Sequence, residues 1–136
     1  MIKKEFTVEK EDYLNAGKVS SQIKNILKQL ELPTNILRRI AVACYEAEIN
    51  MVIHSDGGIV IMEIDDDALY LRFKDKGPGI EDLEKAFTPG YSTADQKARE
   101  MGFGAGMGLV NIKRVSDELK IDSSKSGTNL ELRWNL

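Results

Sequence analysis

The chain has 136 residues, of which 42% are hydrophobic and 30% are charged, and its net charge at pH 7 is −3. These values are typical of one soluble globular domain over residues 1–136, large enough to bury a core without disulfides or metal. The acidic balance argues against general binding to nucleic acid or to a membrane surface.

The sequence contains few residues that indicate membrane targeting, a disulfide or a metal site. No apolar run reaches membrane-spanning length and no segment resembles a signal peptide, so we expect a cytoplasmic protein. The one cysteine, Cys44, excludes an internal disulfide, and with one histidine, His54, a Cys/His zinc site is excluded as well. Cys44 lies among alanine and valine residues, which predicts a buried, unreactive thiol.

The first part of the chain predicts a strand followed by two helices. Residues 2–8 form the strand. Apolar residues then recur at helical spacing from Asp12, a suitable N-cap, to about Leu30. Pro33-Thr34 interrupts this pattern, and a second helix runs to about His54.

The remainder predicts four strands, a long irregular region and a short helix. Gly57-Gly58 ends the second helix, and the short helix covers residues 109–116. The four strands are expected at residues 59–64, 69–75, 119–123 and 128–134. Because helices and strands segregate along the chain, we expect an α+β fold, a two-layer sandwich with helices on one face of a mostly antiparallel sheet.

Three clusters of charge are interpreted as solvated surface. The acidic residues 65–67 join two strands and predict a hairpin turn, which we prefer to a cation site because adjacent acids do not supply spaced ligands. The basic pairs Arg38-Arg39 and Lys113-Arg114 have acidic neighbours, and a partner contact is the alternative for them.

The glycine run at residues 102–108 is the most informative segment. Glycine stands at every second position, which suits neither a strand nor a helix interior. A helical pattern begins directly after it, and a flexible loop that opens a helix presents free N–H groups and a positive dipole end. We therefore expect a ligand that carries phosphate. The patterns GxxxxGK[ST] and GxGxxG are absent, which argues against a P-loop and a dinucleotide fold.

Two further patterns carry polar groups suited to such a ligand. Glu46 and Asn50 are four residues apart in an apolar helix and could hold Mg²⁺ or act as a general base, although the helix alone favours an ordinary wet face. Glu48 lies about half a turn away and is expected to face solvent. The Asp75-Lys76-Gly77-Pro78-Gly79 segment lets the backbone approach a flat ligand while Asp75 accepts from an exocyclic amine, and an Asp-initiated turn is the alternative.

The order of these patterns resembles a known fold family. An acid and an amide on a helix, Asp75-x-Gly77-x-Gly79 after a strand, a glycine loop before a helix, and Gly127-Thr128 before a final strand are similar to the Bergerat-type ATP-binding fold of gyrase, Hsp90, histidine kinases and MutL. Within this superfamily the chain most resembles the small bacterial anti-sigma-factor and switch serine/threonine kinases. The closest segments are DKGPGI at 75–80, GYST at 90–93, GAGMGL at 104–109 and VSDEL at 115–119. The resemblance covers nearly the whole chain.

This resemblance implies ATP and Mg²⁺ as ligands and gives each matching residue a role. Glu46 would orient or deprotonate the attacking hydroxyl, and Asn50 would coordinate Mg²⁺. Asp75 would bind the adenine amino group, with Thr128 supporting it through a hydroxyl or a shared water. The base would rest against Gly77 and Gly79.

The same resemblance places the triphosphate and a lid. The backbone around Met107 would wrap the phosphates, together with Gly104, Gly106 and Gly108. The segment at 87–101 would close over the site and bring Lys97 and Arg99 towards the phosphates, with a mobile charged loop as the alternative reading of these two residues. His54 is expected to be the C-terminal residue of its helix and not a catalytic group.

Three functions remain in view. The first is a kinase that phosphorylates a serine or threonine of an STAS-domain antagonist protein in partner-switching control of transcription. The second is an ATP- or ADP-gated module that holds a sigma factor or phosphatase without transferring phosphate. The third is the ATPase half of a histidine kinase, against which the chain offers no helix with its own phosphoacceptor histidine. The family resemblance also implies a possible homodimer.

Overall fold

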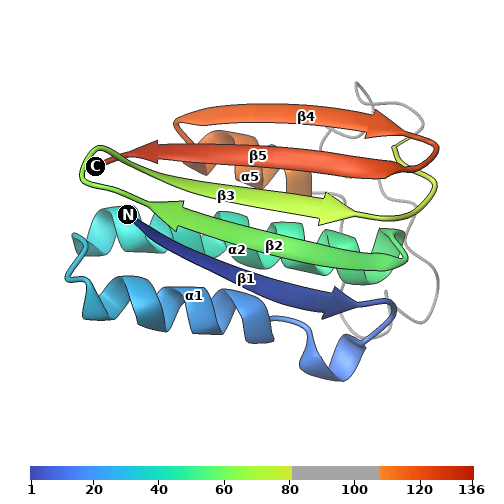
Figure 1. Cartoon of the computed structure of the whole chain (residues 1–136), viewed down its shortest axis with the longest axis horizontal. Coiled ribbons are helices and arrows are strands. Elements are labelled where there is room, and N and C mark those ends of the chain that lie inside the picture. The colour runs from blue at the N-terminus through green and yellow to red at the C-terminus, as the bar shows by residue number, and fades with distance from the viewer. Residues whose placement is uncertain (81–107) are drawn as a thin grey trace.

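The computed structural model describes residues 1–80 and 108–136 and shows a two-layer α+β fold (Figure 1). One layer is a five-stranded sheet in the order β1-β2-β3-β5-β4, in which every neighbouring pair is antiparallel. The strands are β1 (Ile2–Glu9), β2 (Gly57–Ile64), β3 (Ala68–Asp75), β4 (Glu118–Ser124) and β5 (Gly127–Asn135). The predicted fold class is confirmed.

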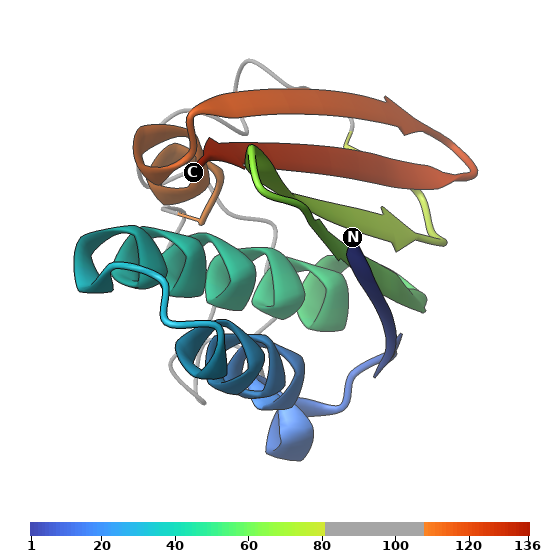
Figure 2. The ribbon, with the colours of Figure 1, turned by 60° about the vertical axis from the view of Figure 1, so that its left-hand side comes forward.

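The helices form the second layer and cover one face of the sheet. A short 3-10 helix, η1 (Tyr13–Asn15), precedes the α-helices α1 (Lys18–Gln29), α2 (Thr34–His54) and α5 (Gly108–Val115). Helix α2 lies between α1 and α5, as the turned view in Figure 2 shows. None of these helices, within the described part of the chain, is long and apolar enough to cross a bilayer.

The core fills the space between the two layers. Alternate residues of β5 point towards the helices, and Trp134 among them is fully buried and donates its indole N–H to the carbonyl of Val115 at 2.8 Å. Cys44 is fully buried in α2, which confirms the predicted burial, and this burial raises the pKa of its thiol.

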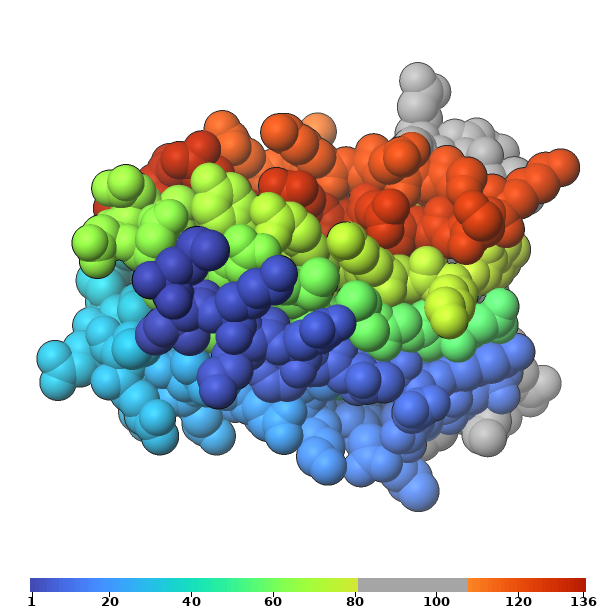
Figure 3. All heavy atoms as spheres, in the orientation of Figure 1, coloured from blue at the N-terminus to red at the C-terminus, as the bar shows by residue number. Residues whose placement is uncertain are grey.

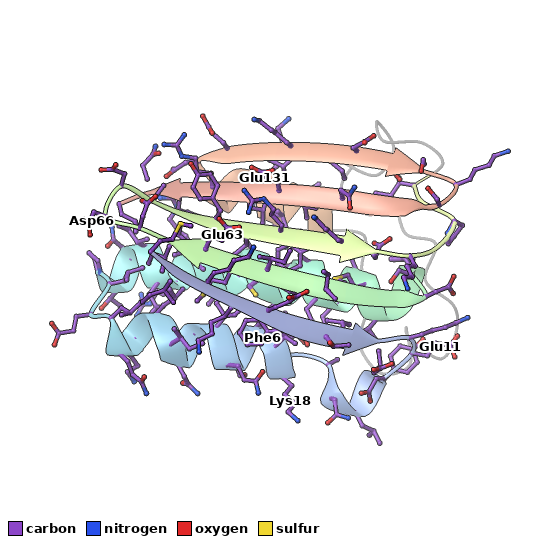
Figure 4. The ribbon with its side chains drawn as sticks, viewed as in Figure 1. Phe6, Glu11, Lys18, Glu63, Asp66 and Glu131 are labelled. Carbon is purple, nitrogen blue, oxygen red and sulfur yellow. The ribbon has the colours of Figure 1, made fainter. Side chains whose placement is uncertain are left out.

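The opposite face of the sheet is polar and charge-paired. Arg72 lies between Glu63 and Glu131, and the Tyr70 ring has the guanidinium groups of Arg72 and Arg133 each 5.6 Å from its centre. Figure 3 shows this face with the strands as adjacent bands, and Figure 4 labels Glu63 and Glu131 on it. Because both signs of charge alternate here, this face needs no covering layer.

Two predicted boundaries differ from those in the structure. The first helix begins at Lys18 and not after Asp12, because Gly17 has φ +95° and separates η1 from α1. Gly57-Gly58 was expected to end the second helix, with a strand from residue 59, but both glycines belong to β2. At Gly58 an added Cβ would lie 2.1 Å from the Lys74 carbonyl oxygen, so the close pairing with β3 requires glycine.

The two ends of the sheet differ in content. The turn between β2 and β3 is the predicted acidic hairpin, in which Asp65 accepts from the N–H groups of Asp67 and Ala68 at 2.8 and 2.9 Å. Both chain termini lie at this end, since Ile2 pairs with Ile64 and the Leu136 N–H donates to the Asp67 carbonyl (Figure 1). The opposite end, where β3 finishes and β5 begins, contains the candidate site.

Candidate functional site

The predicted polar residues converge at one end of the two layers. Asp75 closes β3, and Thr128 lies near the start of the neighbouring strand β5. The last turns of α2 reach the same end, because the Lys76 carbonyl accepts from the Asp56 N–H at 2.6 Å, just after that helix. His54 is the last residue of α2, as predicted.

Glu46 and Asn50 face the first residue of α5. An added Cβ on Gly108 would lie 3.1 Å from both side-chain amide atoms of Asn50 and 3.4 Å from Oε2 of Glu46. The two α2 residues are therefore neighbours on one face, as their spacing predicts, and the helix that follows the glycine loop starts directly against them. Any larger residue at position 108 would press on the amide of Asn50.

Two opposing effects act on the pKa of the Glu46 carboxyl group. Burial raises its pKa, and a hydrogen bond with Asn111 on α5 acts in the other direction. Asn111 was not among the residues predicted for the site. It lies in the first turn of α5, three residues after Gly108, which is the spacing that places two residues on one helix face.

Asp75 and Thr128 make a direct contact through the backbone of Thr128. The backbone N–H of Thr128 donates to Oδ1 of Asp75 at 2.9 Å, whereas the Thr128 hydroxyl lies 2.8 Å from the hydroxyl of Ser123 on β4. Burial raises the pKa of Asp75, the Thr128 N–H opposes that rise, and the negative charge of Asp56 adds to it.

The two glycines after Asp75 lie where other residues would clash. Gly77 packs against the backbone of Ser55, to which an added Cβ would approach within 3.2 Å. Gly79 has φ +75°, and an added Cβ there would lie 2.0 Å from the Ser124 carbonyl oxygen. Both positions therefore require glycine to bring the turn after β3 against α2 and β4.

Glu48 occupies a different place from the one predicted. It was expected to face solvent, but only 2% of its surface is exposed. Its carboxylate accepts from the N–H groups of Gly17, Val19 and Ser20 at 2.9, 3.3 and 2.8 Å. Glu48 thus satisfies the free donors at the start of α1 and is a structural residue, because α1 covers the side of α2 to which it points.

One of the basic pairs is also more than a solvated face. Arg39 on α2 donates through Nε to the Val115 carbonyl at 3.0 Å and through Nη2 to Asp117 at 2.7 Å, so it holds the end of α5. Its neighbour Arg38 is exposed, as predicted.

Several predicted residues lie outside the described residues. These are the phosphate-loop residues Gly104, Gly106 and Met107, and the lid residues Lys97 and Arg99. Within the described ranges, no group of three or more His, Cys, Asp or Glu side chains is arranged to hold a metal ion. A cation at this site would be held by Asn50 and by oxygens from a ligand. Such a site suits Mg²⁺, because this ion commonly binds few protein ligands together with phosphate and water.

Comparison with known proteins gives a consistent set of relatives. A family model described as a histidine kinase-like ATPase domain matches residues 10–134. The anti-sigma F factor of Bacillus velezensis is 31% identical over 121 residues, covering 84% of this chain and 80% of that protein. The serine/threonine-protein kinase RsbT of Bacillus subtilis (strain 168) is 30% identical over 117 residues, covering 82% of each. The anti-sigma F factor of Clostridium novyi (strain NT) is 31% identical over 117 residues, covering 81% of this chain and 78% of that protein.

Proposed function

The chain belongs to the histidine kinase-like ATPase domain family, and from this membership we propose that it is an ATP-dependent serine/threonine protein kinase of the anti-sigma-factor and switch type. Its substrate would be a serine or threonine of an STAS-domain antagonist protein in partner-switching control of transcription. A sigma factor or a phosphatase is a further candidate partner, and a homodimer is the candidate assembly.

One observation carries the proposal. Gly108, the first residue of α5, lies against both Asn50 and Glu46. A helix start offers free N–H groups and a positive dipole end to phosphate. A carboxylate and an amide oxygen beside that helix start are the groups needed to accept a proton and to share a cation with phosphate oxygens.

In the proposed transfer the phosphoryl group passes directly from ATP to the substrate hydroxyl, and the protein forms no covalent bond to it. The attacking hydroxyl oxygen forms a bond to the γ-phosphorus, the bond from that phosphorus to the bridging oxygen breaks, and ADP leaves. Glu46 would take the proton of the attacking hydroxyl. Its raised pKa suits a proton acceptor that works near neutral pH, because a stronger base accepts the proton more readily.

The other residues would bind and orient ATP. Asn50 would hold Mg²⁺ with the phosphates, and the ion would spread the negative charge of the transferred group. Asp75 would accept from the adenine amine, and Gly77 and Gly79 would lie against the base. Gly104, Gly106, Met107 and Gly108 would supply the phosphate-binding backbone.

The test is phosphate transfer from labelled ATP to the STAS-domain proteins encoded in the same genome. Glu46→Gln keeps the size of the side chain but removes the proton acceptor. We expect transfer to fall by about 100-fold or more while the Kd for ATP, measured by calorimetry, changes little. Glu5→Gln, an exposed residue on the other face of the sheet, is the matched control and should transfer like the wild type.

Each alternative has its own outcome. ATP binding without transfer to any of these proteins would indicate a nucleotide-gated binding module. Transfer to a histidine, which gives an acid-labile phosphate, would indicate a histidine kinase domain. Failure of the wild type to bind ATP would overturn all three proposals.

A further inference from the structure

A chain of hydrogen bonds behind Asp75 reaches the segment after Gly79. The Ile80 N–H donates to Oγ of Ser123 at 2.6 Å, and that oxygen lies 2.8 Å from Oγ1 of Thr128. Thr128 in turn donates its backbone N–H to Asp75. Ser123 and Thr128 are direct partners on β4 and β5, so both side chains point to the helix side of the sheet.

The direction of the bond between the two hydroxyls decides what Thr128 can offer a ligand. Each hydroxyl has one hydrogen and two acceptor lone pairs. Ser123 already accepts from Ile80. If Thr128 also donated to Ser123, the Ser123 hydrogen would lack an acceptor among its contacts within residues 1–80 and 108–136. If Ser123 donates to Thr128, both oxygens are satisfied and the Thr128 hydrogen is left for the site.

Burial strengthens this argument at Thr128. Only 8% of its surface is exposed, so its hydroxyl has little access to bulk water. When a buried hydroxyl oxygen already accepts a hydrogen bond, its own hydrogen still needs an acceptor, and a bound molecule can supply one. The hydrogen-bond accounting therefore favours a chain that runs from the Ile80 N–H, through Ser123, to Thr128.

We propose that Ser123 is a positioning residue that makes the Thr128 hydroxyl a hydrogen-bond donor towards the bound base and thereby selects adenine. The proposal rests on the proposed function, because it needs a purine nucleotide in the site. With Oδ1 of Asp75 occupied by the Thr128 N–H, its second oxygen is left as an acceptor beside the Thr128 donor. Adenine presents an amine donor next to a ring-nitrogen acceptor, whereas guanine presents a carbonyl acceptor next to a ring N–H donor. The pair of protein groups matches the first arrangement and opposes the second.

An alternative is that Ser123 only supports the backbone around Gly79. A Cβ added to Gly79 would lie 2.8 Å from the Ser123 hydroxyl oxygen. The two roles predict different results with a base that lacks the ring acceptor. Loss of a structural support weakens binding of every nucleotide alike. Loss of the oriented Thr128 donor weakens only nucleotides whose ring nitrogen accepts from it.

The experiment measures by calorimetry the affinity for ATP and for 1-deaza-ATP, in which a C–H replaces the ring nitrogen beside the amine. Ser123→Ala should weaken ATP binding by about tenfold and leave 1-deaza-ATP binding as in the wild type. Ser123→Thr keeps the hydroxyl and should restore ATP affinity. Ser124→Ala is the matched control, because that neighbouring hydroxyl contacts Ser126 and not Thr128.

Three results would overturn the proposal. Equal weakening of ATP and 1-deaza-ATP in Ser123→Ala would assign the residue to structural support alone. ATP affinity unchanged in Ser123→Ala would remove Ser123 from the site altogether. Failure of the wild type itself to bind ATP would overturn the proposed function first and this proposal with it, and the wild-type measurement distinguishes that case.

Discussion

The two oxygens of Asp75 have different tasks. One accepts from the Thr128 N–H at 2.9 Å, which fixes the carboxylate, and the other is the proposed acceptor for the adenine amine. Burial and the nearby charge of Asp56 raise the pKa of this group. The folded protein therefore binds the Asp75 proton more tightly than the unfolded chain does. Ionising the group costs stability as pH rises above its ordinary pKa, which is about 4.

Asp75→Asn should remove ATP binding without destabilising the protein. The asparagine oxygen can still accept from Thr128, but its amide nitrogen is a donor and would face the adenine amine. We expect the Kd for ATP to rise by at least about 30-fold, and the melting temperature at neutral pH to stay level or increase, because a costly buried charge is gone. Calorimetry and thermal melting test this. Full-strength ATP binding by the variant would show that the adenine assignment is wrong.

At the scale of elements, the start of α1 depends on a carboxylate from another helix. Glu48 on α2 supplies the acceptor for three backbone N–H groups of residues 17, 19 and 20, because α1 has no side-chain cap of its own. Glu48 and Glu46 are two residues apart on one helix and point to different neighbours. The first joins α1 to α2, and the second faces α5.

Glu48→Ala should therefore lower stability rather than nucleotide affinity. It leaves buried donors without a partner, which costs at least about 2 kcal/mol of unfolding free energy, and Glu48→Gln should cost less because one oxygen remains. Urea unfolding measures the loss, and calorimetry on the folded protein should find ATP affinity close to that of the wild type. Glu46→Gln is the matched comparison, and it should keep wild-type stability while losing phosphate transfer. Equal stability of Glu48→Ala and wild type would contradict this role.

The start of α1 could not be predicted from the sequence, whereas the end of α2 could. Periodicity located α2 to its last residue, because its apolar pattern and its breakers are local in the chain. The start of α1 was misjudged because its cap lies 31 residues away, in Glu48, and a helical wheel gives no information about which neighbouring helix covers each side. The same limit applied to Ser123 and Asn111. Each gains its role from a partner on another element, and neither lies in a recognisable motif.

At the scale of the whole molecule, a few polar contacts fasten the second layer to the sheet. Oδ1 of Asp117 accepts a hydrogen bond from Nη2 of Arg39 on α2 at 2.7 Å. Its Oδ2 accepts from the backbone N–H of Asn135 on β5 at 2.8 Å. Arg39 also reaches the last carbonyl of α5. A single aspartate between α5 and β4 thus joins α2 to strand β5 of the sheet.

This junction should weaken in acid. The Arg39 guanidinium holds the pKa of Asp117 below its ordinary value, so its contribution to stability is present above about pH 4 and is lost as pH falls through the lower pKa of the folded state. Asp117→Asn should be less stable than wild type near neutral pH by up to about 1 kcal/mol, since the pair is partly exposed, and the difference should vanish in acid. Urea unfolding across this pH range tests it, with exposed Asp122→Asn as control. A difference independent of pH would contradict the assignment.

The opposite placement of termini and site has a practical consequence. Both chain ends lie beside the acidic hairpin, whereas Asp75 finishes an 8-residue strand at the other end of the sheet. At about 3.3 Å per residue, roughly 25 Å of strand separates them. A fluorescent reporter, an affinity handle or a sensor surface attached through either terminus would therefore lie at the end of the sheet opposite the proposed nucleotide site.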